Sequence, residues 1–299
     1  MSHLKDDWFT NYEIMRDIKN RAPLFRREDF IGKRVIDIGC NTGQMSRFAR
    51  DQGAVSVLGV DCDSTAIRIA REKAPDLDFM CDDIENYSFV SMLDNYDTGL
   101  LLSVIGTEEL GTPVLLLSRL SQKVKVLYIE GHHKVYQKEQ LLSTILESTN
   151  FTCIEYIGHS YDNKVQLIPR HIFRCSYDII DRDAVIHMVR SVIECPGDHL
   201  IAFQGHGGVG KTHFKDRLIR EINPGPDVEI KDDIIYYKKV KRCLLYFDFR
   251  VLTYLFGQPI DILFIFRGDI KTRMNNRPEC SNDRSEYVRG EINKIYHVQ

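Results

Sequence analysis

Two glycines and two carboxylates lie close together early in the chain, in a pattern that suits the binding of a nucleoside. The segment VIDIGCNTGQ (35–44) is an apolar strand that breaks into a turn of small residues shortly after Asp37. Glycine in such a turn lets a ligand lie against the main chain, where a Cβ would block it. A second apolar stretch, residues 55–60, ends at Asp61. In nucleoside-binding folds a carboxylate at this position accepts hydrogen bonds from ribose hydroxyls.

The spacing of this turn separates it from dinucleotide-binding loops, which follow the pattern G-x-G-x-x-G. The segment resembles instead the first motif of the class I S-adenosylmethionine-dependent methyltransferases, acid-x-Gly-x-x-x-Gly. The resemblance implies S-adenosylmethionine as cofactor, with Asp61 at its ribose and Asp82 in an acidic loop near its adenine. The cofactor-binding residues that it implies are Asp37, Gly39, Cys40, Asn41, Gly43, Asp61 and Asp82. The alternative is an ordinary βαβ unit with surface acids.

Candidate groups for the methyl-transfer step follow two further apolar stretches. Residues 96–104 lead toward Glu109, and residues 124–130 lead into His132. Open α/β sheets place their chemistry at such strand ends. Methyl transfer needs the acceptor held in line, often beside a base that removes its proton, so we expect Glu109 and His132 to be catalytic, with Glu130 as a further candidate. The alternative for each is local hydrogen bonding, and the methyl acceptor stays open.

A second chemical motif begins two thirds of the way along the chain. The strand-like stretch 199–204 is followed by GHGGVGKT (205–212), a complete G-x-x-x-x-G-K-T phosphate loop. Backbone N–H groups of Gly205, Gly208 and Gly210 would cradle phosphate oxygens. Lys211 would reach the β and γ phosphates as a catalytic cation, and Thr212 would ligate Mg²⁺. The alternative is a degenerate loop that is kept for structure.

Acids and arginines after the phosphate loop suggest a subclass. Asp248 and Arg250 follow an apolar strand, and arginines recur in a charged segment at 273–284. This order resembles thymidylate and deoxynucleoside kinases, which implies ATP or GTP with Mg²⁺ as cofactor. In that resemblance Asp248 holds Mg²⁺ or orients the substrate, and Asp232 or Asp233 is the base for an acceptor hydroxyl.

The composition of the chain indicates the class of protein in which both motifs occur. The chain has 299 residues, 43% hydrophobic and 28% charged, with a formal net charge of -3 and eight cysteines without a C-x-x-C pair. These values indicate a globular protein of a reducing compartment, and we expect it to be cytoplasmic, without a membrane segment or a structural zinc site. Nucleic acid as a partner is not excluded, because a basic cluster occurs at 238–242. The oligomeric state is open.

Together these features predict an α/β protein of two domains. Residues 1–176 are expected to form a Rossmann-like class I methyltransferase sheet, and residues 177–299 a smaller P-loop α/β domain of kinase type. The first hypothesis is a bifunctional enzyme that transfers a methyl and a phosphoryl group to a small molecule of nucleoside or sugar type. The second is a methyltransferase whose P-loop domain binds nucleotide or substrate for regulation. The third is an RNA-modifying methyltransferase.

Overall fold

The structure is a computed structural model that falls into two compact units. It describes residues 18–85, 90, 93–107, 110–132, 137–161, 168–205, 209–222, 228–231, 234–237, 241–247, 250–252, 259–266, 287–289 and 292–299. The first unit comprises Met1–Phe151 and Tyr156–Tyr177, and the second comprises Thr152–Glu155 and Asp178–Gln299. The main division lies one residue after the domain boundary expected from the sequence. Among the described helices, none is long and apolar enough to cross a membrane.

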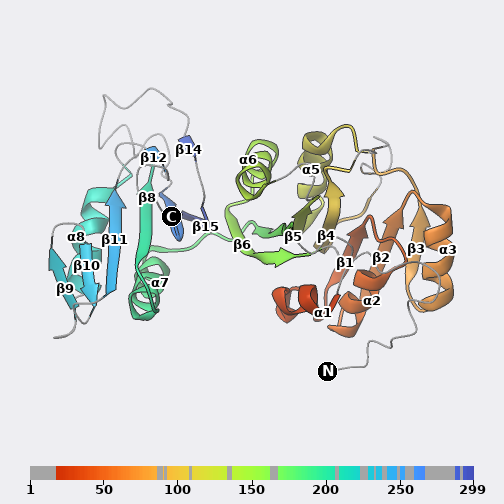
Figure 1. Cartoon of the computed structure of the whole chain (residues 1–299), viewed down its shortest axis with the longest axis horizontal. Helices are drawn as coiled ribbons and strands as arrows, with labels where there is room; N and C mark the ends of the chain where they lie inside the picture. The colour runs from red at the N-terminus through yellow and green to blue at the C-terminus, as the bar shows by residue number, and fades with distance from the viewer. Residues whose placement is uncertain are drawn as a thin grey trace. The chain divides into compact units, whose positions relative to one another are not determined.

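The first unit is a mostly parallel sheet, as near-continuous apolar strands favour. Its strands are β1 (Arg34–Ile38), β2 (Ser56–Asp61), β3 (Asp78–Cys81), β4 (Tyr96–Ile105), β5 (Val124–Gly131), β7 (Arg170–Ser176) and the later part of β6 (Cys153–Ser160). They follow the order β3-β2-β1-β4-β5-β7-β6 (Figure 1). Strands β1 to β5 pair in parallel and β7 runs antiparallel to β5. The carboxyl ends of β1, β2, β4 and β5 therefore lie along one edge of the sheet.

Helices connect these strands. They are α1 (Ile18–Arg21), α2 (Gln44–Asp51), α3 (Ser64–Lys73), α5 (Pro113–Ser121) and α6 (Lys138–Ser148), with 3-10 turns η2 (Ala22–Leu24) and η3 (Arg27–Asp29). The alternation of strand and helix confirms the predicted α/β class.

A buried ion pair attaches η3 to the sheet of the first unit. Arg174 on β7 donates two hydrogen bonds to the Asp29 carboxylate, at 2.7 and 2.9 Å, and the Tyr128 hydroxyl donates a third. Although burial alone raises the pKa of Asp29, these donors and the charge of Arg174 hold it below its usual value. The ring of Phe30, which follows η3, stacks on Tyr128 with centroids 6.0 Å apart. This contact fixes the chain that leads into β1.

The strands of the second unit follow a different plan. Its strands are β8 (His199–Gln204), β9 (Val228–Lys231), β10 (Ile234–Tyr237), β11 (Lys241–Phe247), β13 (Ile262–Phe266) and β15 (Lys294–Val298), in the order β15-β13-β8-β11-β10-β9. Strand β8 is parallel to both neighbours, β11 and β13, whereas β10 is antiparallel to β9 and β11. The first residues of β6 pair antiparallel with β15. A separate two-stranded sheet joins β12 (Arg250–Leu252) to β14 (Tyr287–Arg289).

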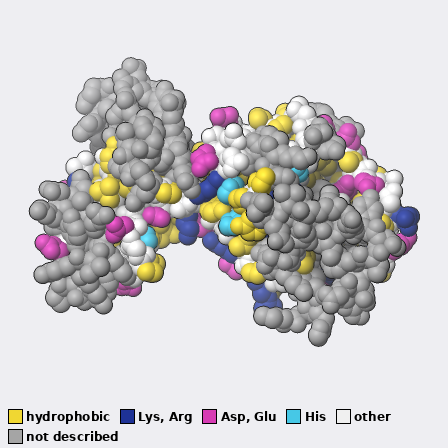
Figure 2. Space-filling model, in the orientation of Figure 1, with side chains coloured by type: hydrophobic (Ala, Val, Ile, Leu, Met, Phe, Trp, Pro, Cys, Tyr) yellow, Lys and Arg dark blue, Asp and Glu magenta, His cyan; other side chains and the backbone are white. Residues whose placement is uncertain are grey.

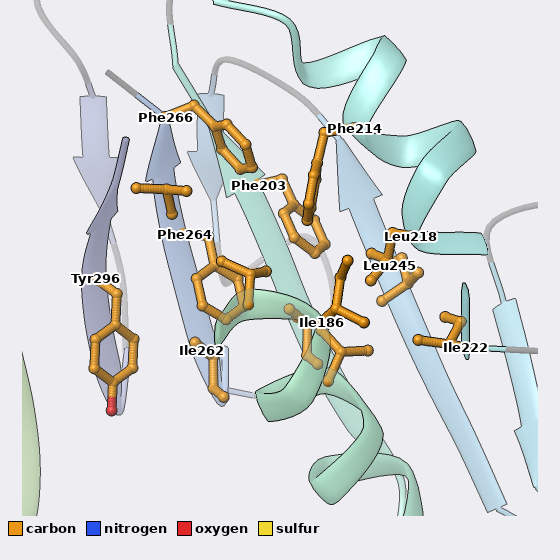
Figure 3. Packing of buried hydrophobic residues seen from close by; sticks show 14 of the residues in the cluster. Ile186, Phe203, Phe214, Leu218, Ile222, Leu245, Ile262, Phe264, Phe266 and Tyr296 are labelled. Atoms are coloured by element: carbon orange, nitrogen blue, oxygen red, sulfur yellow. The ribbon is translucent and has the colours of Figure 1, made fainter. Parts of the chain in front are cut away.

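Helices α7 (Arg182–Glu194) and α8 (Lys211–Ile222) share one apolar core with strands of this unit. Phe203 of β8 lies at its centre, where it stacks on Phe264 of β13 with centroids 5.4 Å apart. Phe203, Phe214 and Phe266 point toward one another at the end of β8 that leads into the phosphate-loop sequence (Figure 3). The aromatic cluster thereby sets the position at which β8 gives way to α8.

Candidate cofactor sites

The loop between β1 and α2 uses its own backbone amides internally. Each N–H group from residue 39 to residue 43 donates a hydrogen bond to another protein atom, at 2.8 to 3.0 Å. The pairs are Gly39 N and Cys40 N to the Val60 carbonyl, Asn41 N to Asp61 Oδ2, Thr42 N to Asn41 Oδ1 and Gly43 N to the Cys40 carbonyl. This loop therefore has no free row of N–H groups for an anion, and the carboxylates beside it come from Asp61 and Asp82.

Asp61 is the central acid of this site. It ends β2, is partly exposed and accepts N–H bonds from Asn41 at 2.8 Å and from Asp63 at 2.9 Å, one on each oxygen. A carboxylate has about four acceptor positions, so both oxygens retain capacity for ribose hydroxyls. Acidic side chains are visible on the first unit near the ends of β2 and β3 (Figure 2).

Asp82 lies next to Asp61 along the same edge. Its N–H donates to the Asp61 carbonyl at 3.1 Å, and its carboxylate accepts the Asp83 N–H at 2.8 Å. The side chain is partly exposed just after β3. The structure thus brings Asp61, Asp82 and the loop of Gly39 to Gly43 together, and their role in cofactor binding stays a prediction.

The reason for glycine at position 39 differs from the one that the sequence suggested. Gly39 has a φ of +74°, and a Cβ on it would lie 2.3 Å from Cγ2 of Val104, at the end of β4. A side chain is excluded by this neighbouring strand, whether or not a ligand is present. Gly43 meets the Phe79 ring in the same way. Close packing of β1 and β4 therefore accounts for the first glycine of the motif.

Asp37 lies beneath the loop. Its side chain is buried and accepts a hydrogen bond from the Ser46 hydroxyl at 2.6 Å, which joins β1 to α2. Burial raises the pKa of Asp37 to about 6, with a smaller contribution from the charge of Asp61 and an opposing one from Ser46. Cys40 is also buried, and burial together with Asp37 raises the pKa of its thiol. Direct contact of Asp37 or Cys40 with a cofactor stays a prediction.

Glu130, at the end of β5, is fully buried. Arg21 of α1 donates to its two oxygens at 3.0 and 2.7 Å, and the hydroxyls of Ser103 and Ser160 donate one bond to each oxygen. With donors on both oxygens, this carboxylate is an ion-pair partner that holds α1 against β4 and β5. The geometry does not favour Glu130 as a base.

Ser103 takes part in this cluster with an uncommon backbone. Its φ is +63°, the left-handed region that non-glycine residues rarely occupy, and the register of β4 against β5 shifts between Leu102 and Ile105. Strained backbone at a strand end is a frequent mark of functional sites. His132 follows at the end of β5, partly buried, and its N–H donates to the Ile105 carbonyl at 2.7 Å. Glu109, the other predicted catalytic residue, lies outside the described residues.

The second loop, between β8 and α8, has the opposite chemistry. The first helical hydrogen bond of α8 runs from Phe214 N to the Gly210 carbonyl, so the first turn of this helix directly follows the phosphate-loop sequence. Such a helix start is suited to phosphate oxygens. Lys211 folds back and donates its ammonium to the Gly205 carbonyl, and Thr212 is exposed on the first turn.

Gly205 allows β8 to end against its neighbour. It has a φ of +148°, and a Cβ on it would lie 2.6 Å from the Phe266 carbonyl oxygen of β13. Gly210 is the residue before α8. Gly208 and the predicted metal ligand Asp248 lie outside the described residues, as do Asp232 and Asp233. Within the described part of the chain, no cluster of three or more His, Cys, Asp or Glu side chains is placed to hold a metal ion.

Sequence reasoning missed Arg21, Ser103 and Ser160 around Glu130, and Arg182, which donates to the Val209 carbonyl beside the second loop at 3.1 Å. No spacing rule links residues 109 positions apart, as Arg21 and Glu130 are. One signal was present, because Ser103 interrupts the apolar run that fills the later part of β4.

Comparison with known proteins identifies similarity to methyltransferases in the segment that contains the first loop. The model of the family described as "Methyltransferase domain" matches residues 35–106. The ribosomal protein L11 methyltransferase of Deinococcus radiodurans is 46% identical over 48 residues, which are 16% of this chain and 18% of the relative. An uncharacterized protein of Methanocaldococcus jannaschii is 38% identical over 66 residues, 21% of this chain and 30% of that protein. The chain thus spans less than a third of either curated relative.

Among solved structures, WbdD, described as a bifunctional kinase-methyltransferase, aligns with a TM-score of 0.49 and 20% identity. The alignment covers 60% of this chain and 44% of WbdD. A putative RNA methyltransferase of Pyrococcus horikoshii aligns with a TM-score of 0.44 and 19% identity, over 58% of this chain and 90% of that one. Likenesses at this level do not bear on the reaction.

Proposed function

We propose that this chain, whose residues 35–106 match the model of a methyltransferase domain, is a bifunctional enzyme with a class I S-adenosylmethionine-dependent methyltransferase unit. Its first unit transfers a methyl group from S-adenosylmethionine. Its second unit transfers a phosphoryl group from Mg²⁺-bound ATP or GTP to a small acceptor of nucleoside or sugar type. The two cofactor loops, each between a buried strand and a helix of its own unit, are the observation that carries the proposal.

The residues of the first loop fit the cofactor of the methyltransferase domain. S-adenosylmethionine would supply an electrophilic methyl group on a sulfonium cation. Asp61 is fixed by two backbone N–H groups and has oxygens left for ribose hydroxyls. Asp37 and Asp82 add negative charge at the same edge, which favours a cationic ligand over a neutral one. Glu130, Arg21 and Ser103 give the acceptor side a rigid floor.

The residues of the second loop fit a nucleotide triphosphate. ATP or GTP with Mg²⁺ would supply the phosphoryl group. The start of α8 offers N–H groups, and Lys211 lies on the first turn with its ammonium at the loop. Strand β11 is the parallel neighbour of β8 and pairs Phe247 with Phe203. Asp248 follows Phe247 directly in sequence, so it is the candidate for orienting Mg²⁺ at the same edge.

Titration calorimetry on the full chain tests both halves. S-adenosylhomocysteine and Mg²⁺-ATP are titrated into wild type, Asp61→Ala and Lys211→Ala. The proposal expects each ligand to bind the wild type and each substitution to remove binding of its own ligand only. Silence with S-adenosylhomocysteine would overturn the methyltransferase assignment. Silence with both Mg²⁺-ATP and Mg²⁺-GTP would overturn the phosphoryl-transfer half.

Turnover separates the bifunctional enzyme from a methyltransferase with a regulatory nucleotide domain. Wild type is incubated with Mg²⁺-ATP and a panel of nucleosides and sugars, and released ADP is measured. Acceptor-dependent ADP release that Lys211→Ala abolishes supports phosphoryl transfer. Nucleotide binding that alters methyl transfer without acceptor-dependent ADP release favours the regulatory alternative instead.

A further inference from the structure

We propose that Arg182 is a positioning residue for the phosphate loop of the second unit. The inference rests on the nucleotide site proposed above and adds to it a residue that the loop motif does not contain. Arg182 is the first residue of α7 and precedes the loop by more than twenty positions. Its role is to fix the peptide group that leads into Lys211, so that an N–H group of the loop faces the phosphate.

Among the described residues, Arg182 contacts the end of the loop and the end of β13. Its Nη2 donates to the Val209 carbonyl at 3.1 Å. Its guanidinium carbon lies 5.6 Å from the centroid of the Phe266 ring, in a cation–π arrangement. A Cβ on Gly210 would lie 3.3 Å from the same Nη2. The guanidinium is therefore packed between the end of β13 and the last residues of the loop, and the side chain is partly buried.

Because the peptide group is planar, the hydrogen bond to its carbonyl also fixes the direction of its N–H group. The Val209 carbonyl and the Gly210 N–H belong to one planar trans peptide, in which C=O and N–H point in opposite directions. Arg182 holds the carbonyl on its own side, so it turns the Gly210 N–H to the other side of the loop. Glycine at 210 would otherwise leave this peptide free to rotate, because its backbone has the widest conformational range.

Charge adds to the same effect. A guanidinium is positively charged, and its hydrogen bond polarises the peptide toward a stronger N–H donor. Phosphate oxygens accept from such donors, and a positive charge behind the loop favours the anion without touching it. Arg182 acts through the Val209–Gly210 peptide and is therefore not expected to contact the nucleotide.

The same helix provides a matched control. Arg190 also lies on α7, and its Nη2 also donates to a backbone carbonyl, that of Glu221 at the far end of α8. Arg190→Ala removes the same kind of interaction from the same helix at a distance from the loop. Arg182→Lys keeps the charge and a single donor but not the planar guanidinium over Phe266.

The experiment measures the affinity for Mg²⁺-ATP and the melting temperature of wild type, Arg182→Ala, Arg182→Lys and Arg190→Ala, all as full chains. Loss of a hydrogen bond to a charged group predicts that Arg182→Ala binds at least about tenfold more weakly. Arg182→Lys should recover part of this loss. Arg190→Ala should bind as the wild type does, even where its melting temperature falls as far as that of Arg182→Ala.

Three results would overturn the inference. Equal affinity of Arg182→Ala and wild type would leave the nucleotide site in place but remove Arg182 from it. Equal weakening by Arg182→Ala and Arg190→Ala, in step with their melting temperatures, would reduce Arg182 to a general packing residue. Absence of Mg²⁺-ATP and Mg²⁺-GTP binding by wild type would remove the proposed nucleotide site itself, and with it the role of Arg182.

Discussion

The loop after β1 and the loop after β8 occupy the same place in their units, yet they present opposite chemistry. Both join a buried strand to a helix. In the first, every N–H group from residue 39 to residue 43 is bound by a protein oxygen, and the exposed functional groups are the carboxylates of Asp61 and Asp82. In the second, the described residues place two cationic side chains, Lys211 and Arg182, at the start of α8.

The difference shows that a strand–turn–helix junction does not by itself define the ligand. The charge of the side chains beside the turn differs between the two loops. A turn that binds its own amides beside carboxylates suits hydroxyl groups and a cation, whereas a helix start beside lysine and arginine suits phosphate. S-adenosylmethionine carries a positive charge at its reacting group and ATP or GTP carries negative charge, so we expect the two cofactors to bind independently.

The largest effect is expected from Lys211→Ala. Removing the cation nearest the phosphates should lower phosphoryl transfer about a hundredfold or more, because such groups stabilise the charge that develops in the transition state. Affinity for S-adenosylhomocysteine should stay the same. ADP release and calorimetry measure the two effects. Arg220→Ala, at the exposed far end of α8, is the control and should change neither. If the Lys211→Ala protein still turned over nucleotide at the wild-type rate, the proposed difference between the two loops would be wrong.

The buried Asp37 under the first loop predicts that the free energy of unfolding depends on pH. The folded protein holds the Asp37 proton to a pKa of about 6, whereas the unfolded chain releases it near 3.8. The free energy of unfolding should therefore fall as pH rises from about 4 to about 6, by about 3 kcal/mol, and stay level above that. Asp37→Asn should remove this fall and so be the more stable protein at pH 7.

Urea unfolding of wild type and Asp37→Asn between pH 4 and pH 8 measures the difference. Ser46→Ala is the informative companion, because Ser46 lowers the pKa of Asp37 and its loss should extend the fall to higher pH. An identical pH profile for wild type and Asp37→Asn would show that Asp37 is not the titrating group. Stability gained together with weaker binding of S-adenosylmethionine, but not of neutral S-adenosylhomocysteine, would indicate that the acid is kept for the cationic ligand.

Gly39→Ala separates a packing reason for the glycine from a ligand reason. The positive φ and the clash with Val104 together predict a loss of about 2 kcal/mol in the free energy of unfolding without any ligand. The double variant Gly39→Ala/Val104→Ala should be compared with Val104→Ala alone. In that comparison the part of the stability loss that is due to the clash should disappear, and the part that is due to the positive φ should remain. A Gly39→Ala protein of normal stability that fails to bind S-adenosylhomocysteine would restore the explanation suggested by the sequence.

The sequence predicted the α/β class and the first cofactor loop because both depend on local patterns. Apolar strands, a turn of small residues and an acid at the next strand end are contiguous in the chain, and they gave Gly39, Gly43 and Asp61 in their observed neighbourhood. Strand order and register depend on long-range pairing instead. Nothing local indicated that β10 would run antiparallel between β9 and β11.

The functional side chains that sequence reasoning missed are those whose partners are distant in the chain. Glu130 looked like a base at a strand end, and only its contacts with Arg21, Ser103 and Ser160 show it as an ion-pair partner. Arg182 belongs to no sequence motif, and its relation to the loop depends on how α7 packs on β13. Sequence spacing identifies ligand-binding loops more readily than it identifies the side chains that hold them in place.

The smallest effect is expected from Asp61→Asn, and it tests how the first loop is built. Asparagine keeps the shape but offers one acceptor oxygen, so one of the N–H groups of Asn41 and Asp63 would face an amide donor. Affinity for S-adenosylhomocysteine should fall about tenfold, the usual effect of losing a hydrogen bond to a charged group, while Mg²⁺-ATP binding is unchanged. Calorimetry measures both, with Asp78→Asn, exposed at the start of β3, as the control. Because the same carboxylate orients the loop and faces the ligand, Asp61→Asn should also lower the melting temperature of the ligand-free protein, and a purely ligand-dependent loss would mean that the two N–H bonds are dispensable for the loop.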